Sequence, residues 1–322
     1  MRPPAFLSSV AALLLGCQHA PPSVASALTA PAASTVATGV HLAAEAPLQW
    51  TPDSAAVVVA GRWRVDRDTG AWRDLGLGRA DALLAISPGG HLARIDARQI
   101  VLPGSPARTL QVPAFVGGED EPSTSGYWLD EQHLYLHQAQ PIQGDSACRI
   151  LDVRDGSLSP SPHCVEGDFA AVHHLERGPG DLVAVHSAGE GHPGLRLVRF
   201  TPAAGTTPLP GADLDLYPFG PVWVSWLADG QRAALVSPCA LGQRDRPCEG
   251  ISDQAMTGLY LFDIAQGKLG PLGARLPPGA VAAPDGRHIA WVRRGRLCVA
   301  VPAQADARTC WAPPGGDEED AR

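Results

Sequence analysis

An internal repeat is the sequence feature that most constrains the fold. Its sharpest copy spans residues 281–299, where two apolar runs flank a Pro-Asp-Gly turn and a second turn leads into a third apolar run. Clear copies of this order begin near residues 48, 83 and 224, and weaker copies near residues 126 and 180 make six in all. A unit of this size leaves an apolar face bare unless neighbouring units stack on it. The repeat therefore predicts small antiparallel sheets packed against one another.

Composition also favours strands joined by turns. The chain has 35 Gly and 31 Pro among its 322 residues. No stretch of a dozen residues carries helical apolar spacing without a Gly or Pro in it. Short apolar runs, such as residues 56–59 and 259–262, are separated by turn residues instead. We expect an all-β domain of the sandwich, barrel or propeller class.

The order of apolar strand, Ser/Ala-Pro-Asp-Gly-like turn and second apolar strand resembles the repeat of the TolB-like propellers, relatives of the WD-repeat propellers. This resemblance extends over nearly the whole domain. It implies a six-bladed β-propeller over residues 39–312, in which radial stacking buries the face that each blade leaves bare. Trp50, Trp128 and Trp226 occupy equivalent repeat positions, so we expect them to pack between blades rather than to form a carbohydrate platform.

Closure of the ring is assigned to the segment before the first repeat. The first and last blades of a propeller must be joined, because an open sheet edge and an apolar blade face would otherwise meet water. Residues 35–42 contain several β-branched side chains and precede the first turn at a suitable distance. We therefore expect them to form the outermost strand of the blade that holds residues 281–311.

The N-terminal residues resemble a bacterial lipoprotein signal. Arg2 gives a short positive start, residues 5–15 are apolar, and the run ends in Leu-Leu-Gly-Cys at Cys17, which resembles a lipobox. The apolar run is too short to span a bilayer, which needs about 20 apolar residues. We expect a signal peptide over residues 1–16 and lipidation of Cys17. The alternative is an ordinary secretory signal followed by an unrelated Cys.

The anchor implies a place in the bacterial cell envelope. Gln18, rather than Asp, follows the Cys, which by analogy with known lipoproteins favours the outer membrane, facing the periplasm or the cell surface. Residues 17–38 contain no Asp, Glu, Lys or Arg and are typical of a flexible tether. The acidic residues 313–322 are typical of a disordered, solvated tail.

Six further cysteines are expected to form disulfides, as is usual for an exported domain. The sequence alone does not choose among the pairings. The repeat register suggests one set, because three neighbouring pairs fall inside single blades: Cys148 with Cys164, Cys239 with Cys248, and Cys298 with Cys310. A metal site is the rival interpretation, but the chain has no Cys-x-x-Cys spacing.

Motifs for catalysis are absent from the sequence. It contains no Gly-x-Ser-x-Gly elbow, no His-Glu-x-x-His and no Gly-Lys-Ser/Thr loop. His133, Tyr135 and His137 alternate along one expected strand, so we expect them on a solvent-facing surface. The fourth repeat carries a group of histidines that could converge, although a histidine-bearing blade edge is favoured: His173, His174, His186 and His192. We therefore predict no catalytic residue, no metal ligand and no cofactor.

These observations favour a non-catalytic, membrane-anchored binding or scaffolding propeller, with a protein or a small ligand at the mouth of its channel. A net charge of −8, with Lys268 as the only lysine, disfavours nucleic acid as a partner. The alternative is a small-molecule hydrolase or lactonase of the six-bladed type with a metal in the central channel. That enzyme would need inward Asp, Glu, Asn or His side chains at equivalent blade positions.

The Cys17→Ser variant should leave the membrane fraction and remain folded, because only the Cys17 thiol can accept the lipid. Membrane fractionation followed by immunoblotting measures this. Deletion of residues 19–35 is the matched control and should leave the protein membrane-bound. A Cys17→Ser variant that still sediments with membranes would contradict the predicted anchor.

Overall fold

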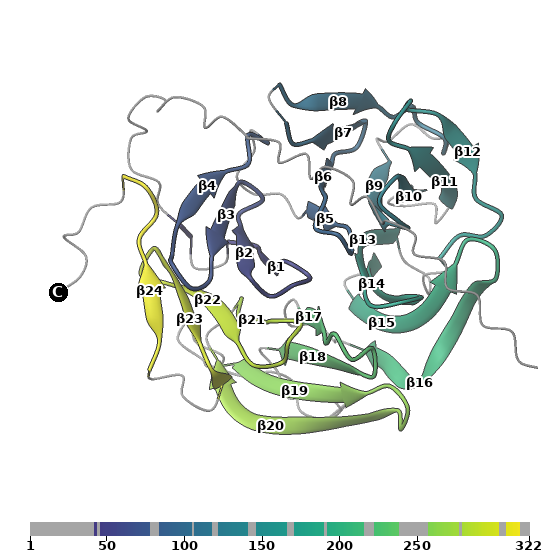
Figure 1. Ribbon diagram of the computed structural model, residues 1–322. Coiled ribbons are helices and arrows are strands. Elements are labelled where there is room, and N and C mark those ends of the chain that lie inside the picture. The colour runs from purple at the N-terminus through teal and green to yellow at the C-terminus, as the bar shows by residue number, and fades with distance from the viewer. Residues whose placement is uncertain are drawn as a thin grey trace, which may run out of the picture. The chain divides into compact units, whose positions relative to one another are not determined.

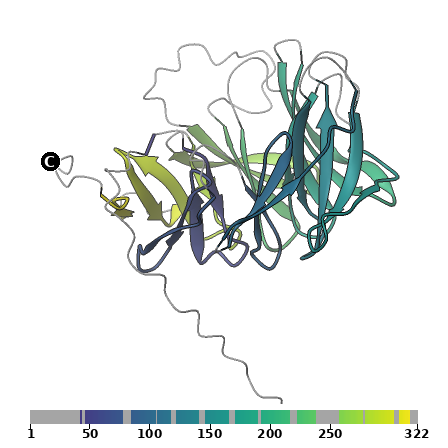
Figure 2. The same ribbon diagram turned by 90° about the horizontal axis from the view of Figure 1, so that it is seen from above.

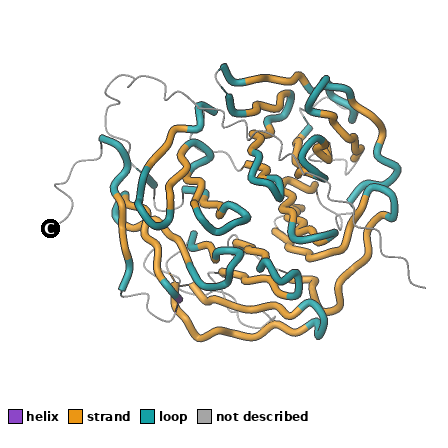
Figure 3. The backbone as a smooth tube through the Cα atoms, viewed as in Figure 1, coloured by secondary structure: helices purple, strands orange, loops and turns teal. Residues whose placement is uncertain are grey.

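Six four-stranded antiparallel sheets make up the computed structural model, and each sheet pairs its strands in chain order (Figure 1). They belong to one compact unit, residues 37–322. The structure describes residues 42–43, 46–77, 84–104, 106–117, 122–140, 146–165, 171–189, 192–215, 222–237, 257–276, 279–302 and 307–315. This part of the chain contains no α-helix (Figure 3). The all-β, six-bladed propeller implied by the TolB-like repeat is confirmed.

Each of the six repeats becomes one blade, with a fourth strand beyond the three that the repeat makes plain. The strands of the first three blades are β1 (Leu48–Trp50), β2 (Ala56–Val59), β3 (Trp63–Asp66) and β4 (Trp72–Asp74); β5 (Leu84–Ile86), β6 (Leu92–Ile95), β7 (Gln99–Leu102) and β8 (Arg108–Gln111); and β9 (Ser123–Trp128), β10 (His133–Ala139), β11 (Ser146–Asp152) and β12 (Leu158–Pro160).

The last three blades follow the same order. Their strands are β13 (Ala171–Arg177), β14 (Leu182–Gly189), β15 (His192–Thr201) and β16 (Gly205–Asp215); β17 (Trp223–Trp226), β18 (Arg232–Ser237), β19 (Thr257–Asp263) and β20 (Lys268–Leu276); and β21 (Val281–Ala282), β22 (Ile289–Arg293), β23 (Arg296–Ala300) and β24 (Thr309–Trp311). The first strand of each blade lies nearest the centre of the ring and the fourth lies outermost (Figure 1). Seen at 90°, the strands run across the thickness of the ring (Figure 2).

The core is divided among the interfaces between blades. Each of the six hydrophobic clusters joins two neighbouring blades, and together they go round the ring. The cluster between the third and fourth blades, for example, packs Tyr135 against Val185 and Phe200. Both faces of each sheet are therefore covered by apolar neighbours, which is what radial stacking requires.

The predicted tryptophan positions are confirmed as inter-blade contacts. Each indole N–H donates a hydrogen bond to a backbone carbonyl on the first strand of the preceding blade. The pairs are Trp50 with Val281, Trp128 with Ala85, and Trp226 with Glu176, at 3.1, 3.1 and 3.3 Å. The first, third and fifth blades thus each carry a tryptophan that packs on the preceding blade and hydrogen-bonds to one of its backbone carbonyls. No backbone ladder joins these neighbouring blades in the described residues.

Residues 35–42 are predicted to supply the outermost strand of the last blade, and only Leu42 of this segment belongs to the described residues. In the described part of that sheet the outermost strand is β24, which follows β23 in the chain. Residues 35–41 lie outside the described residues, and Leu42 is not in a strand. Its side chain, only 3% exposed, instead packs in the cluster between the first and last blades. In the described part of the last blade, all four strands come from the repeat itself, and the outermost of them lies on its C-terminal side.

Side chains close the ring between the first and last blades. Besides the Trp50 indole, the backbone N–H of Asp285 donates to Ser54 Oγ at 2.9 Å. Arg67 lies 3.5 Å from the Asp285 carboxylate. Among the described residues, the closure therefore combines apolar packing with a few directed polar contacts.

Two of the three predicted cysteine pairs are disulfides in the structure. Cys148 of β11 is bonded to Cys164, just beyond β12. Cys298 of β23 is bonded to Cys310, its direct cross-strand partner on β24. Each bond lies inside one blade, as the repeat register predicts. The third predicted pair, Cys239 with Cys248, lies outside the described residues, as do Cys17, the predicted signal peptide and the whole predicted tether.

Among the described residues, no helix has the length and apolar character needed to cross a membrane.

Candidate functional site

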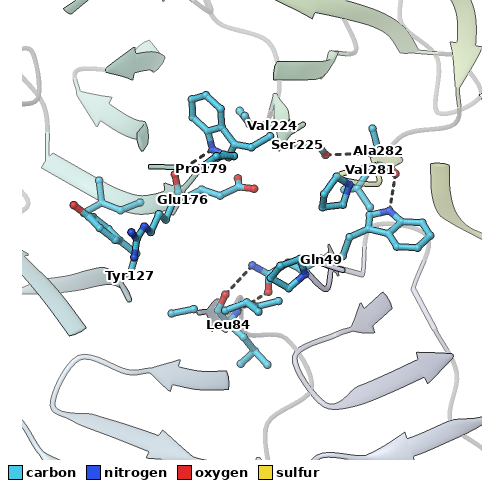
Figure 4. Close-up of a pocket in the computed structure, with 18 of the residues that line it drawn as sticks. Gln49, Leu84, Tyr127, Glu176, Pro179, Val224, Ser225, Val281 and Ala282 are labelled. Carbon is cyan, nitrogen blue, oxygen red and sulfur yellow. Dashed lines mark hydrogen bonds between the residues drawn. The ribbon is translucent and has the colours of Figure 1, made fainter. Parts of the chain in front are cut away.

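A cavity of about 670 Å³ lies where the first strands of the six blades meet. Its lining includes residues of β1, β5, β9, β13, β17 and β21. Most of these side chains are apolar, among them Leu84, Val224 and Val281 (Figure 4). At one end the wall is formed by prolines in the turns that follow these first strands: Pro52, Pro88, Pro179 and Pro284. The repeated turn thus places one rigid, weakly polar residue from each of four blades at the same end of the channel.

Polar side chains connect the first strands of neighbouring blades, which in the described residues are not paired by backbone hydrogen bonds. The Gln49 amide donates to the Leu84 carbonyl and accepts from the Leu84 N–H, both at 2.8 Å (Figure 4). Ser225 Oγ accepts a hydrogen bond from the Ala282 N–H at 3.1 Å. These contacts satisfy backbone groups that face the channel, and they hold neighbouring first strands at a fixed separation.

Three side chains with metal-binding or acid–base chemistry converge on the wall of this cavity. His174 and Glu176 come from β13, and His186 comes from β14. One ligand atom from each lies within 4.8 Å of the others. His186 Nε2 is 4.0 Å from Glu176 Oε2, and the two imidazole rings have centroids 5.3 Å apart. Figure 4 shows the Glu176 carboxyl group projecting into the open centre of the cavity.

The local environment changes the charge of these groups. The Glu176 side chain keeps 29% of its surface accessible through the channel, but removal from bulk water raises the pKa of its carboxyl to about 8. The neighbouring Arg177 guanidinium turns away and donates to the backbone carbonyls of Trp128 and Leu129. Burial lowers the pKa of Arg177 and raises that of Tyr127. Burial therefore favours the neutral form of the Glu176 carboxyl compared with a carboxyl in bulk water.

From the sequence, the four histidines of the fourth repeat could converge, but a position of these side chains along the edge of the blade is favoured. The structure brings His174 and His186 together, whereas the side chains of His173 and His192 lie outside the described residues. Glu176 is absent from the sequence prediction. The signal that could have found it is its position two residues after His174 on one strand, which places both side chains on the same face.

The expectation that His133, Tyr135 and His137 face solvent is wrong. Tyr135 is fully buried and His137 is only 1% exposed, while His133 stays at the edge beside Asp130. The Tyr135 hydroxyl contacts Cys148 Sγ and accepts from the Val165 N–H at 2.8 Å. Alternation puts the three on one face, as predicted, but a propeller covers both faces of a blade.

The sequence matches no protein-family model and no curated protein. Among solved structures, the chain is similar to hydrazine synthase from Kuenenia stuttgartiensis, with 15% identity, coverage of 84% of this chain and 81% of that one, and a TM-score of 0.49. It is similar to TolB from Acinetobacter baumannii at 17% identity, covering 81% of this chain and 61% of that one, with a TM-score of 0.46. Oligogalacturonate lyase from Vibrio parahaemolyticus shows 13% identity over 87% of this chain and 80% of that one, with a TM-score of 0.45.

Burial of His137 makes the fold sensitive to acid. Desolvation lowers the pKa of this imidazole from 6.5 to about 4 in the folded state. Between these pH values the unfolded chain binds more protons, so the free energy of unfolding falls as the pH drops, by about 1.4 kcal/mol per unit for this group. The His137→Leu variant should lose this contribution and show a flatter pH dependence in urea unfolding.

The exposed His163 provides the matched control, because its ring meets water in both states. His163→Leu should keep the wild-type slope between pH 6.5 and 4. If His137→Leu loses stability in acid as steeply as the wild type, the ring is not held neutral by burial.

Proposed function

We propose that this chain is a lipid-anchored, non-catalytic binding propeller of the bacterial cell envelope that holds a small ligand in its central channel. The observation that carries the proposal is the channel cavity of about 670 Å³, lined by residues from every blade. Binding sites for small molecules are typically cavities of about 300–1,000 Å³, mostly apolar and with a few polar groups that orient the ligand. This cavity has that size and that balance.

The anchor supports the cellular part of the proposal. A lipid on Cys17 would hold the propeller close to a membrane through the tether of residues 17–38, with the outer membrane as the favoured location. The net charge of −8 argues against nucleic acid as the ligand. A protein could contact the channel mouth as well, but the size and apolar lining of the cavity favour a small molecule as the main ligand.

Blocking the mouth of the channel should abolish binding of a small amphipathic probe. Ala228 is exposed and lines the cavity close to the Pro284 turn, so Ala228→Glu adds bulk and negative charge there without removing a buried contact. We expect anilinonaphthalene sulfonate to bind the wild type with one site per chain and enhanced fluorescence. Binding to Ala228→Glu should be lost.

The matched control places the same charge far from the channel. Ala204 is exposed in the turn between β15 and β16, and Ala204→Glu should bind the probe like the wild type. Equal binding by wild type and both variants, or no saturable binding by the wild type, would refute the channel as the ligand site.

A small-molecule hydrolase with a channel metal is the second candidate function, and the convergence of His174, Glu176 and His186 favours it. All three groups come from one blade, whereas the sequence argument for an enzyme asks for inward polar groups at equivalent positions of several blades. Turnover of an aryl ester or a lactone by the purified protein, lost in His186→Ala, would favour the enzyme over the binding module.

A further inference from the structure

We propose that His174, Glu176 and His186 bind one divalent transition-metal ion, and that this ion anchors the polar end of the channel ligand. Only the second part of the proposal, that the ion anchors the channel ligand, rests on the proposed function, because it assigns the polar contact of that ligand. The metal site itself stands on the geometry of β13 and β14.

A bulge in the inner strand pair creates the cluster. Val172 pairs with Ser187 and His174 pairs with His186, so residue 173 is an extra residue in the ladder. Without it, His174 would lie opposite Val185 and its side chain would point to the other face of the sheet. The bulge therefore puts His174 and Glu176 on the same face as His186, and that face lines the cavity. Bulges commonly redirect side chains next to functional sites.

The spacing of the three groups suits a metal after a small adjustment. Their ligand atoms lie within 4.8 Å of one another, and His186 Nε2 is already 4.0 Å from Glu176 Oε2. Imidazole and carboxylate ligands sit about 2.0–2.2 Å from zinc, which places tetrahedral ligands about 3.4 Å apart. Side-chain rotations that bring the atoms closer by about an ångström complete the set, and the partly open channel leaves room for them.

Two imidazoles and one carboxylate are a recognised donor set for metals that keep an open position. The same set holds zinc in sites with one position left for water or substrate, and iron(II) in facial triads. Since all three ligands come from the wall on one side, the open coordination positions face the cavity.

This arrangement specifies the chemistry of the ligand. The open metal position accepts an anionic oxygen, such as that of a carboxylate, a phosphate or a hydroxamate. The rest of the cavity wall is mostly apolar and suits an uncharged body, with Val224 on one neighbouring strand and Leu84 on another. We infer a small molecule that has an apolar body and one anionic, oxygen-bearing group.

Cobalt(II) tests the metal site directly. Full-length protein in detergent, stripped of metal with a chelator, is titrated with Co²⁺ while the visible absorption is recorded. The wild type should bind one ion per chain, with the intense d–d bands of a four- or five-coordinate site and without the charge-transfer bands that cysteine ligands produce. Zn²⁺ should displace the cobalt and remove the bands.

Matched variants assign the ligands. Glu176→Gln preserves shape and burial, and His186→Ala removes one imidazole; both should lose the bands while retaining the wild-type far-ultraviolet circular dichroism. His163→Ala, an exposed histidine outside the cluster, should retain them. A wild type without a stoichiometric site, or folded Glu176→Gln and His186→Ala variants with unchanged spectra, would overturn the metal site.

The open position is tested by adding acetohydroxamate to the cobalt-loaded wild type. A shift of the d–d bands supports the ligand anchor, and an unchanged spectrum overturns it. These results are separable from the probe assay with Ala228→Glu. A protein that binds the dye in the channel but no cobalt disproves the metal alone, whereas cobalt binding without any dye binding disproves the small-ligand channel.

Discussion

The ring depends on side chains that join neighbouring blades, because the hydrogen-bonded ladder of every described sheet stops at its first strand. Six apolar clusters, one at each interface, supply most of the cohesion. The indoles of Trp50, Trp128 and Trp226 add directional hydrogen bonds, since each indole N–H donates to a backbone carbonyl on the preceding blade. Removing any one interface would open the ring, so the stability of each blade depends on its two neighbours.

The same constraint creates the site. First strands that do not pair with one another leave a space between them, and the side chains on their inner edges decide what fills it. Gln49 and Ser225 bridge adjacent strands and keep that space open. The bulge in β13 then adds chemistry to one part of the wall by turning His174 and Glu176 toward His186. Framework and site are therefore made from the same six first strands, with His186 added from β14.

Much of the fold is predictable from the sequence, because turns and apolar runs repeat with the blades and the tryptophans recur at one position. The disulfides Cys148–Cys164 and Cys298–Cys310 follow from the same register. The candidate site is less predictable. Alternation shows which side chains share a face but not whether that face is covered, which is why the burial of His137 is missed. A one-residue bulge leaves no clear sequence pattern, so the convergence of His174 and Glu176 with His186 is missed as well.

The most direct test of the account is a crystal structure of the full chain purified from its host with no ligand added. The central claim is that the channel is the binding site. It predicts electron density for a small molecule inside the cavity, with its polar end at Glu176 and its body against the apolar wall. A channel filled with water alone, together with a molecule or partner bound elsewhere on the blades, would contradict it.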